Sequence, residues 1–194
     1  MPEHEAIIEY ARAFVPFTDE EAAEFAGAFT NRHIKKRQFL IQPGFVDRYK
    51  YFVIKGAIRA YVIDNEGMER TVQLAIDQWW ISDYNSYLMQ EPASMFVIAM
   101  EDCDILQISF GDEQRLKAAN HKFETFFRMM AEKGVAFMQR RFISANTHSA
   151  EERYNLFMDR YPQMMTRFPQ FVIASYLGMT TQFLSKIRSQ KAKS

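Results

Sequence analysis

The sequence predicts an α+β protein in which helices flank an antiparallel β-roll. Residues 38–110 alternate short apolar runs with glycine-containing turns, which is the pattern of short antiparallel strands. Two capping-box motifs and a long apolar stripe of helical period lie outside this region. With 194 residues, 48% of them hydrophobic, the chain is long enough to bury a core without disulfides or metals. We therefore expect N-terminal helices, the roll, a long helix and a C-terminal pair of helices, in that order.

The N-terminal segment is expected to form two helices. Over residues 4–14 the apolar side chains recur at helical spacing. Thr18 and Glu21 have the spacing of a capping box, in which each side chain accepts a hydrogen bond from the backbone N–H of the other residue. The helix that this motif begins carries apolar residues at helical spacing as far as Phe29.

The β region is expected to contain six strands joined by turns. Pro43-Gly44, Lys55-Gly56 and the segment Asp64 to Gly67 interrupt the apolar runs where the chain has to reverse. The expected strands are residues 38–42, 49–54, 57–63, 71–76, 95–100 and 105–110. Residues 77–92 form the longest irregular stretch between them, and connections of this length are often functional.

One long helix, residues 122–146, is expected after a short helix over residues 112–120. Its apolar stripe is about seven turns long. The stripe comprises the six residues named below together with Gly134, Phe142 and Ala145. Stripes of this length often form a two-helix dimer seam. The residues expected in this seam are Phe123, Phe126, Phe127, Met130, Phe137 and Met138. On this hypothesis a glutamate at position 130 or 137 gives monomers; the alternative is that the stripe packs only on its own β domain.

The C-terminal segment has the pattern of a helix-turn-helix. Ser149 and Glu152 form a second capping box, whose helix runs to about Tyr161. A helix from about Pro169 ends at Gly178, and Thr180 can cap the next helix. Phe183, Leu184 and Ile187 are expected in the core of this unit. The side chains expected to contact DNA are Thr180, Thr181, Gln182, Ser185, Lys186 and Arg188. The alternative is a plain helical hairpin.

The charge distribution is uneven although the net charge is zero. Residues 153–194 carry seven cations and one anion, a balance of +6, so the rest of the chain carries −6. A basic C-terminal module is typical of a protein that binds a polyanion such as double-stranded DNA. A solvated basic tail would show the same charge balance.

Several classes of protein are excluded or disfavoured by the composition. The single cysteine, Cys103, excludes an internal disulfide framework, an iron–sulfur cluster with four cysteine ligands and a structural zinc finger. The four histidines are expected outside the strands, so a metalloenzyme site inside the roll is not expected. We find no nucleophile elbow or phosphate-binding glycine loop and expect neither an enzyme nor a cofactor. No membrane-spanning run or signal peptide is recognised, so a cytoplasmic protein is expected.

With this order of elements, the chain resembles the catabolite activator/fumarate–nitrate regulator (Crp/Fnr) superfamily of transcriptional regulators. Residues 49–83 (YKYFVIKGAIRAYVIDNEGMERTVQLAIDQWWISD) are similar to the central strands of the family's roll, and residues 150–190 are similar to its DNA-binding half in the form common among Bacteroidetes members. The resemblance implies an effector domain over residues 1–121, a dimerisation helix over residues 122–147 and a DNA-binding domain over residues 148–194. It also implies a homodimer that binds double-stranded DNA and a small-molecule effector, with RNA polymerase as a candidate protein partner.

Two departures from the family pattern limit the resemblance. Family members that bind cyclic AMP hold its phosphate in a cassette that begins with Gly-Glu and ends with Arg-Ser. These pairs align with Ser82-Asp83 and Ala93-Ser94, so the arginine is missing and tight cyclic AMP binding is not expected. Six residues follow Arg188, so a full wing is not expected. The sequence thus predicts a regulator with a degenerate effector cassette; the alternative is a ligand-binding or protein-interaction module that no longer binds DNA.

Overall fold

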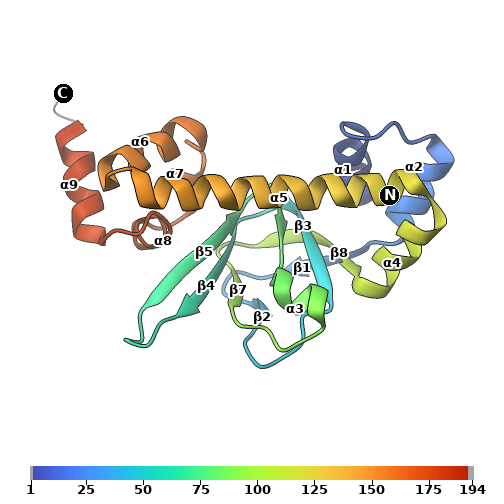
Figure 1. The fold of residues 1–194 in the computed structure, drawn as a ribbon, viewed down its shortest axis with the longest axis horizontal. Coiled ribbons are helices and arrows are strands. Elements are labelled where there is room, and N and C mark those ends of the chain that lie inside the picture. Colours follow the sequence, from blue (N-terminus) through green and yellow to red (C-terminus); the bar gives the residue numbers. More distant parts are fainter. Residues whose placement is uncertain (1, 192–194) are drawn as a thin grey trace.

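The computed structural model describes residues 2–191 and has the expected α+β architecture. Two N-terminal helices, α1 (Pro2–Arg12) and α2 (Asp19–Gly27), precede the strands. A long helix, α5 (His121–Thr147), lies across the roll and joins the two helical ends of the molecule (Figure 1). Within the described part of the chain, no helix combines the length and apolar character needed to cross a bilayer. The expected first and last segments include residues 1 and 192–194, which lie outside the described residues.

Eight strands form two four-stranded antiparallel sheets in the described chain. The first sheet has the order β1-β8-β3-β6 and the second has the order β2-β7-β4-β5. The strands are β1 (Thr30–Ile34), β2 (Phe39–Ile41), β3 (Tyr49–Lys55), β4 (Ile58–Ile63), β5 (Glu69–Ala75), β6 (Trp80–Ile81), β7 (Phe96–Ala99) and β8 (Cys103–Ser109). Side chains from both sheets fill the space between them, including Ile58, Val97 and Ile105. All six expected strands are present within a few residues of their expected bounds.

The sequence interpretation missed three elements of the roll. Strand β1 (TNRHI) is mostly polar because it is an edge strand that pairs only with β8. Within the stretch expected to be irregular, residues 77–92, lie the short strand β6 and the helix α3 (Tyr84–Met89). His33 lies in β1, so the expectation that no histidine is on a strand was wrong, and its exposed ring contacts Asp104 at 2.8 Å. Within residues 2–191, no group of three or more His, Cys, Asp or Glu side chains is arranged to hold a metal ion.

The N-terminal end of α5 belongs to an aromatic core formed with α1 and α2. Phe123 and Phe126 are fully buried there, and both contact Phe25 of α2, with ring centroids 5.7 and 5.1 Å apart. The helix α4 (Phe110–Ala119) leads from β8 into this end of α5. The expected capping box of Thr18 and Glu21 is confirmed at the start of α2.

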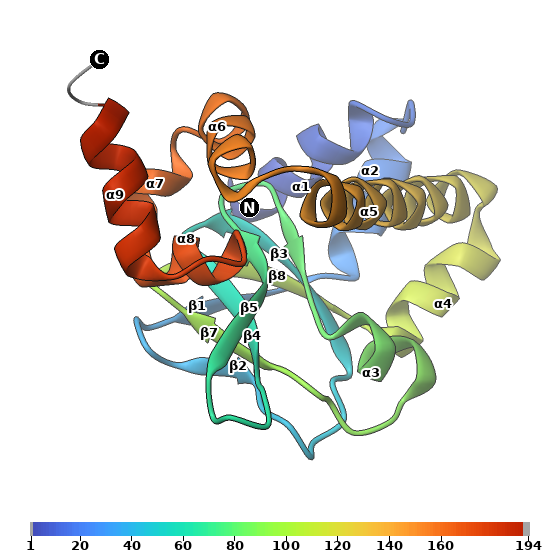
Figure 2. The same cartoon turned by 60° about the vertical axis from the view of Figure 1, so that its left-hand side comes forward.

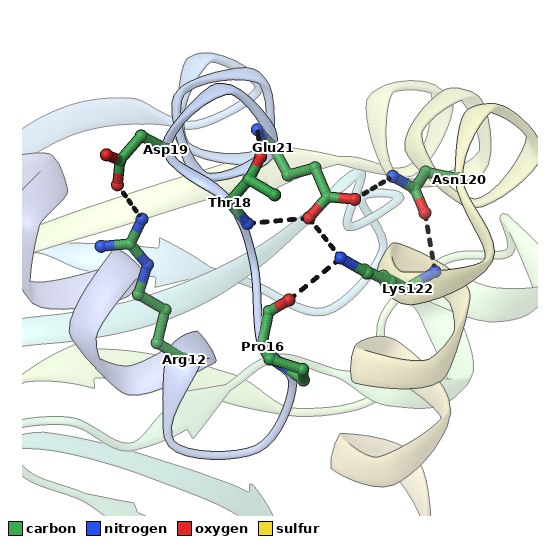
Figure 3. A network of polar contacts seen from close by, with 7 residues as sticks. All are labelled: Arg12, Pro16, Thr18, Asp19, Glu21, Asn120 and Lys122. Carbon is green, nitrogen blue, oxygen red and sulfur yellow. Dashed lines mark hydrogen bonds and ion pairs between the residues drawn. The ribbon is translucent and has the colours of Figure 1, made fainter.

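Polar contacts hold the start of α5 against α2. The Glu21 carboxylate accepts hydrogen bonds from Lys122 Nζ at 2.6 Å, from the Thr18 backbone N–H at 2.8 Å and from Asn120 Nδ2 at 3.1 Å (Figure 3). These contacts, with the Lys122 bond the largest cause, lower the pKa of Glu21 to about 2. Glu21, the second member of the α2 capping box, therefore also binds the start of α5.

The C-terminal helices pack against the outer surface of the roll at the other end of α5 (Figure 2). They are α6 (Ala150–Arg160), α7 (Met164–Arg167), α8 (Gln170–Tyr176) and α9 (Thr181–Lys191). The second capping box, Ser149 with Glu152, is confirmed at the start of α6. Between α8 and α9, Gly178 adopts a φ of 67°, the left-handed conformation that favours glycine at the end of a helix.

Candidate functional site

The two ends of the expected effector cassette meet at a buried carboxylate. Asp83, which is 1% exposed, is the N-cap of α3 and accepts a hydrogen bond from the Ser86 N–H at 3.1 Å. Its Oδ2 accepts hydrogen bonds from the N–H groups of Ser94 at 2.8 Å and Met95 at 3.3 Å, and from Ser94 Oγ at 3.3 Å. Ser82 precedes Asp83 in the chain and is half-buried. The backbone donors at the end of the cassette therefore bond to a carboxylate of this same chain.

Neither Arg59 nor Arg70 takes the place of the missing arginine. Ala93 is 5% exposed and packs among the apolar residues inside the roll. Arg59 pairs with Glu69 and donates to Thr71 Oγ1 at 2.9 Å, and Arg70 pairs with Asp64 at 2.6 Å. Because both arginines are held by other residues, neither neutralises an anion at Ala93.

A second buried carboxylate, Asp47, supports the cassette and was missed by the sequence interpretation. It is 4% exposed and accepts hydrogen bonds from the Tyr51 hydroxyl at 3.1 Å, the Tyr49 N–H at 3.2 Å and the Asp83 N–H at 3.3 Å. Burial raises the pKa of Asp47 to about 6, with the nearby Asp83 charge as a smaller cause in the same direction. A single aspartate between a turn and a strand gives no pattern from which this role could be recognised.

An open cavity of about 280 Å³ lies beside Asp47 between strands β2 and β3. Its lining includes Arg32, Phe39, Phe45, Tyr49 and Tyr51. Arg32 donates a hydrogen bond to Gln107 Oε1 at 3.0 Å. The expected cassette residues Ser82, Asp83, Ala93 and Ser94 are not part of this lining.

A buried ion-pair cluster connects the cassette helix α3 to the helices that follow the roll. Glu113 of α4, 1% exposed, contacts Lys50 of β3 at 2.8 Å and Lys117 at 2.5 Å, and accepts a hydrogen bond from the Tyr87 hydroxyl of α3 at 2.8 Å. Lys50 also lies 5.6 Å from the ring centre of Phe127 in α5. Burial alone would raise the pKa of Glu113, but the two lysines outweigh it and lower this pKa.

The side chains expected to contact DNA lie on the surface of the last helix pair. Thr180, Thr181, Gln182, Ser185, Lys186 and Arg188 are all exposed. Thr180 Oγ1 accepts a hydrogen bond from the Phe183 N–H at 3.2 Å and so caps α9 as expected. Leu184 and Ile187 are buried as expected. Phe183, in the first turn of α9, was expected in the core but is 42% exposed.

Most of the residues expected in a dimer seam face the interior of their own chain, which corrects the sequence interpretation. Phe123, Phe126 and Phe127 belong to the aromatic core with α1 and α2. Met130 packs on this core and accepts a hydrogen bond from the Tyr10 hydroxyl at 3.4 Å, while Phe137 contacts Trp79 of the roll at 6.0 Å between ring centroids. Only Met138 of the expected set is exposed, at 48%. The reason is that the N-terminal helices and the roll cover one face of α5.

Comparisons with known proteins agree with this architecture. Residues 31–120 match the family model of the cyclic nucleotide-binding domain. No curated protein matches the sequence significantly.

Solved structures of transcription regulators share the fold. FixK2 from Bradyrhizobium japonicum has a TM-score of 0.73 at 16% identity, over 85% of each chain. A CooA mutant from Carboxydothermus hydrogenoformans has a TM-score of 0.69 at 16% identity, over 94% of this chain and 82% of that one. The catabolite activator protein of Thermus thermophilus has a TM-score of 0.57 at 17% identity, over 93% of this chain and 86% of that one. These matches do not support the expected similarity to the form common among Bacteroidetes members. Residues 31–120 are therefore similar to a cyclic nucleotide-binding domain, within a fold that the chain shares with regulators of the Crp/Fnr family.

Proposed function

We propose that this protein is a DNA-binding transcriptional regulator of the Crp/Fnr type, without enzymatic activity, that acts as a homodimer. The observation that carries this proposal is the surface of α9, where hydroxyl, amide and cationic side chains share an exposed helix directly after a glycine turn. This helix lies in the segment with a charge balance of +6. Helices of this kind place their N-terminal half against base edges in the major groove.

The proposed contacts follow from the chemistry of each side chain. Gln182, near the N-terminal end of α9, can pair its amide with adenine, and Lys186 can reach guanine or a phosphate. Thr180 and Thr181 lie at the helix start, where backbone N–H groups and the helix dipole favour a phosphate. Ser185 and Arg188 lie further along the helix, and Arg188 is expected to contact phosphate.

The proposed dimer seam is the exposed apolar face of α5. Val135, Met138 and Phe142 are 70%, 48% and 72% exposed. With Ala131 and Ala145 they alternate spacings of four and three residues, which is the heptad pattern of a two-helix seam. This face is turned by about 100° around the helix axis from the face that packs on the N-terminal core. Pairing two copies along it would set the distance between the two α9 helices.

The proposed effector cassette does not hold cyclic AMP tightly. A desolvated phosphodiester needs a charge-assisted partner, and Ala93 offers none. The amides of Ser94 and Met95 bond to Asp83, whose negative charge would repel a phosphate at the same place. The effector of the regulator is therefore a different small molecule, or the regulator has none.

Titration calorimetry tests the cassette. We expect cyclic AMP at millimolar concentration to give little heat beyond dilution with the wild-type protein. The physical reason is the unfavourable pairing of its phosphate with Asp83 in the absence of a guanidinium. Submicromolar binding would contradict the prediction and show that another cation reaches the phosphate.

Substitutions on α9 test DNA recognition. We expect Gln182→Ala to cost about 1–3 kcal/mol of binding free energy at a selected operator and little on random DNA, because it removes base contacts. Arg188→Ala should weaken both complexes alike and reduce the salt dependence by about one unit, because it removes a phosphate contact. Gln139→Ala, an exposed glutamine of α5, is the matched control and should leave both affinities unchanged.

The outcome of the DNA experiment also decides between the two functions that the sequence left open. A shift of bulk DNA that weakens steeply with salt favours the regulator. If the wild type binds no DNA, the ligand-binding or protein-interaction module becomes the better interpretation. If Gln182→Ala leaves the preference for the operator intact, the proposed register of α9 is wrong.

A further inference from the structure

Helix α8 is bound along the free edge of strand β5. This strand is the last in its sheet, so its outer backbone groups have no strand partner among the described residues. Ser175 of α8 bonds to two of them: its Oγ accepts a hydrogen bond from the Thr71 N–H at 2.8 Å and donates one to the Glu69 carbonyl at 2.9 Å. A single hydroxyl therefore attaches the helix to the backbone of the strand.

The long helix α5 contacts the same place through Arg141. Its guanidinium donates hydrogen bonds to the Val72 carbonyl of β5 and to the Tyr176 carbonyl of α8, the latter at 3.1 Å. The guanidinium also lies 4.0 Å from the ring centre of Tyr176. Because the planar guanidinium has several donors in fixed directions, one side chain can set the relative position of three elements.

The buried residues beneath these contacts belong to one continuous core. Leu74 and Ile76 of the roll pack in it with Ile173 of α8 and with Leu184 and Ile187 of α9. Just before α8 in the chain, Arg167 of α7 bonds to Asp77 at 3.1 Å and to Glu101, both in turns of the roll. The helix pair α8–α9 thus rests directly on the roll and not only on the end of α5.

We propose that Ser175 and Arg141 are positioning residues for DNA binding, which dock the α8–α9 pair on the edge of β5 and hold α9 at one orientation relative to α5. The contact with β5 stands on the structure alone, whereas the effect on DNA rests on the function proposed above. A preoriented pair of α9 helices binds an operator with two half-sites more tightly, because the protein loses less conformational freedom on binding. A shift of the β4–β5 hairpin would then move α9 directly.

Hydrogen exchange of the full-length protein tests the docking. The Thr71 N–H bonds to Ser175 instead of to a strand, so Ser175→Ala should speed its exchange by about tenfold or more, while amides in the central strand β3 stay unchanged. Equal acceleration in β3 would indicate global destabilisation and overturn the local interpretation. Unchanged exchange at Thr71 would overturn the docking itself.

Affinity for two kinds of duplex DNA tests the positioning role. The probes are a duplex selected from a random library with the wild-type protein and a duplex of random sequence. Ser175→Ala and Arg141→Lys should each weaken binding to the selected duplex about five- to tenfold and binding to random DNA less than twofold. Arg140→Lys makes the same substitution at the exposed neighbouring position and should keep both affinities within about twofold. Neither lysine variant changes the net charge, so the two variants differ only in position.

The two experiments distinguish failure of the positioning role from failure of the proposed function. If exchange at Thr71 speeds up while the selected duplex binds normally, the contact does not position α9 and the proposal is overturned. If the wild type binds no DNA at all, the proposed function fails and the positioning role falls with it, while the exchange result still decides whether α8 is docked on β5.

Discussion

Phe142→Glu is expected to convert the protein into monomers. The Phe142 side chain is 72% exposed in the single chain and lies in the proposed seam with Val135 and Met138. Two facing glutamates would bury unpaired charge of the same sign in an apolar interface. Sedimentation at micromolar concentration should show dimers for the wild type and monomers for the variant. Since two linked half-sites bind far more tightly than one, affinity for a selected operator should fall by about 100-fold or more.

The controls for this prediction lie on the same helix. Gln139→Glu introduces a charge at an exposed position outside the seam and should leave the dimer intact. Met130→Glu and Phe137→Glu, at the positions that the sequence suggested for the seam, should instead lower the free energy of unfolding, because both side chains pack inside their own chain. A wild type that sediments as a monomer, or a dimer that persists in Phe142→Glu, would refute the seam.

Phe126→Ala is expected to destabilise each chain by about 3–5 kcal/mol without separating the dimer. Phe126 is fully buried, and its ring centroid lies 5.1 Å from that of Phe25 and 6.4 Å from that of Trp80. Truncation would leave a cavity in the rigid aromatic core that joins α5 to α1, α2 and the roll. Denaturant unfolding monitored by circular dichroism measures the loss, and sedimentation monitors the assembly.

The matched substitution for Phe126→Ala is Phe45→Ala. Phe45 is 71% exposed, so its removal should change the free energy of unfolding by no more than about 0.5 kcal/mol. If Phe126→Ala unfolds like the wild type but dissociates the dimer, then Phe126 is a seam residue, as the sequence suggested, and the core described above is wrong.

Local features of the fold could be predicted well from the sequence. The capping boxes of Thr18 with Glu21 and of Ser149 with Glu152 form as expected, and Gly178 has the left-handed conformation expected of a helix end. These features involve residues no more than a few positions apart, so the neighbouring residues alone specify them. The polar edge strand β1 was missed because its pairing with β8 joins distant residues and is not visible in its own apolar pattern.

The candidate sites depended on contacts between distant residues. The sequence identified Asp83 and Ser94 as a pair through the family resemblance, but Asp47, which lies 36 positions before Asp83 and accepts its N–H, belongs to no recognisable motif. The docking of Ser175 on β5 joins residues 104 and 106 positions apart. No local pattern encodes such contacts, because the groups involved meet only after the sheet and the helices have packed.

The long helix α5 has one feature that local periodicity predicts and another that depends on tertiary contacts. Periodicity reports which side chains share a face, so the amino-acid pattern was enough to predict a helix over residues 122–146 with an apolar surface. The packing of the folded chain was needed to show that α1 and α2 cover Phe123, Phe126 and Phe127, while Val135, Met138 and Phe142 stay exposed. The physical reason is that the hydrophobic effect drives apolar surface out of water without specifying the surface that covers it.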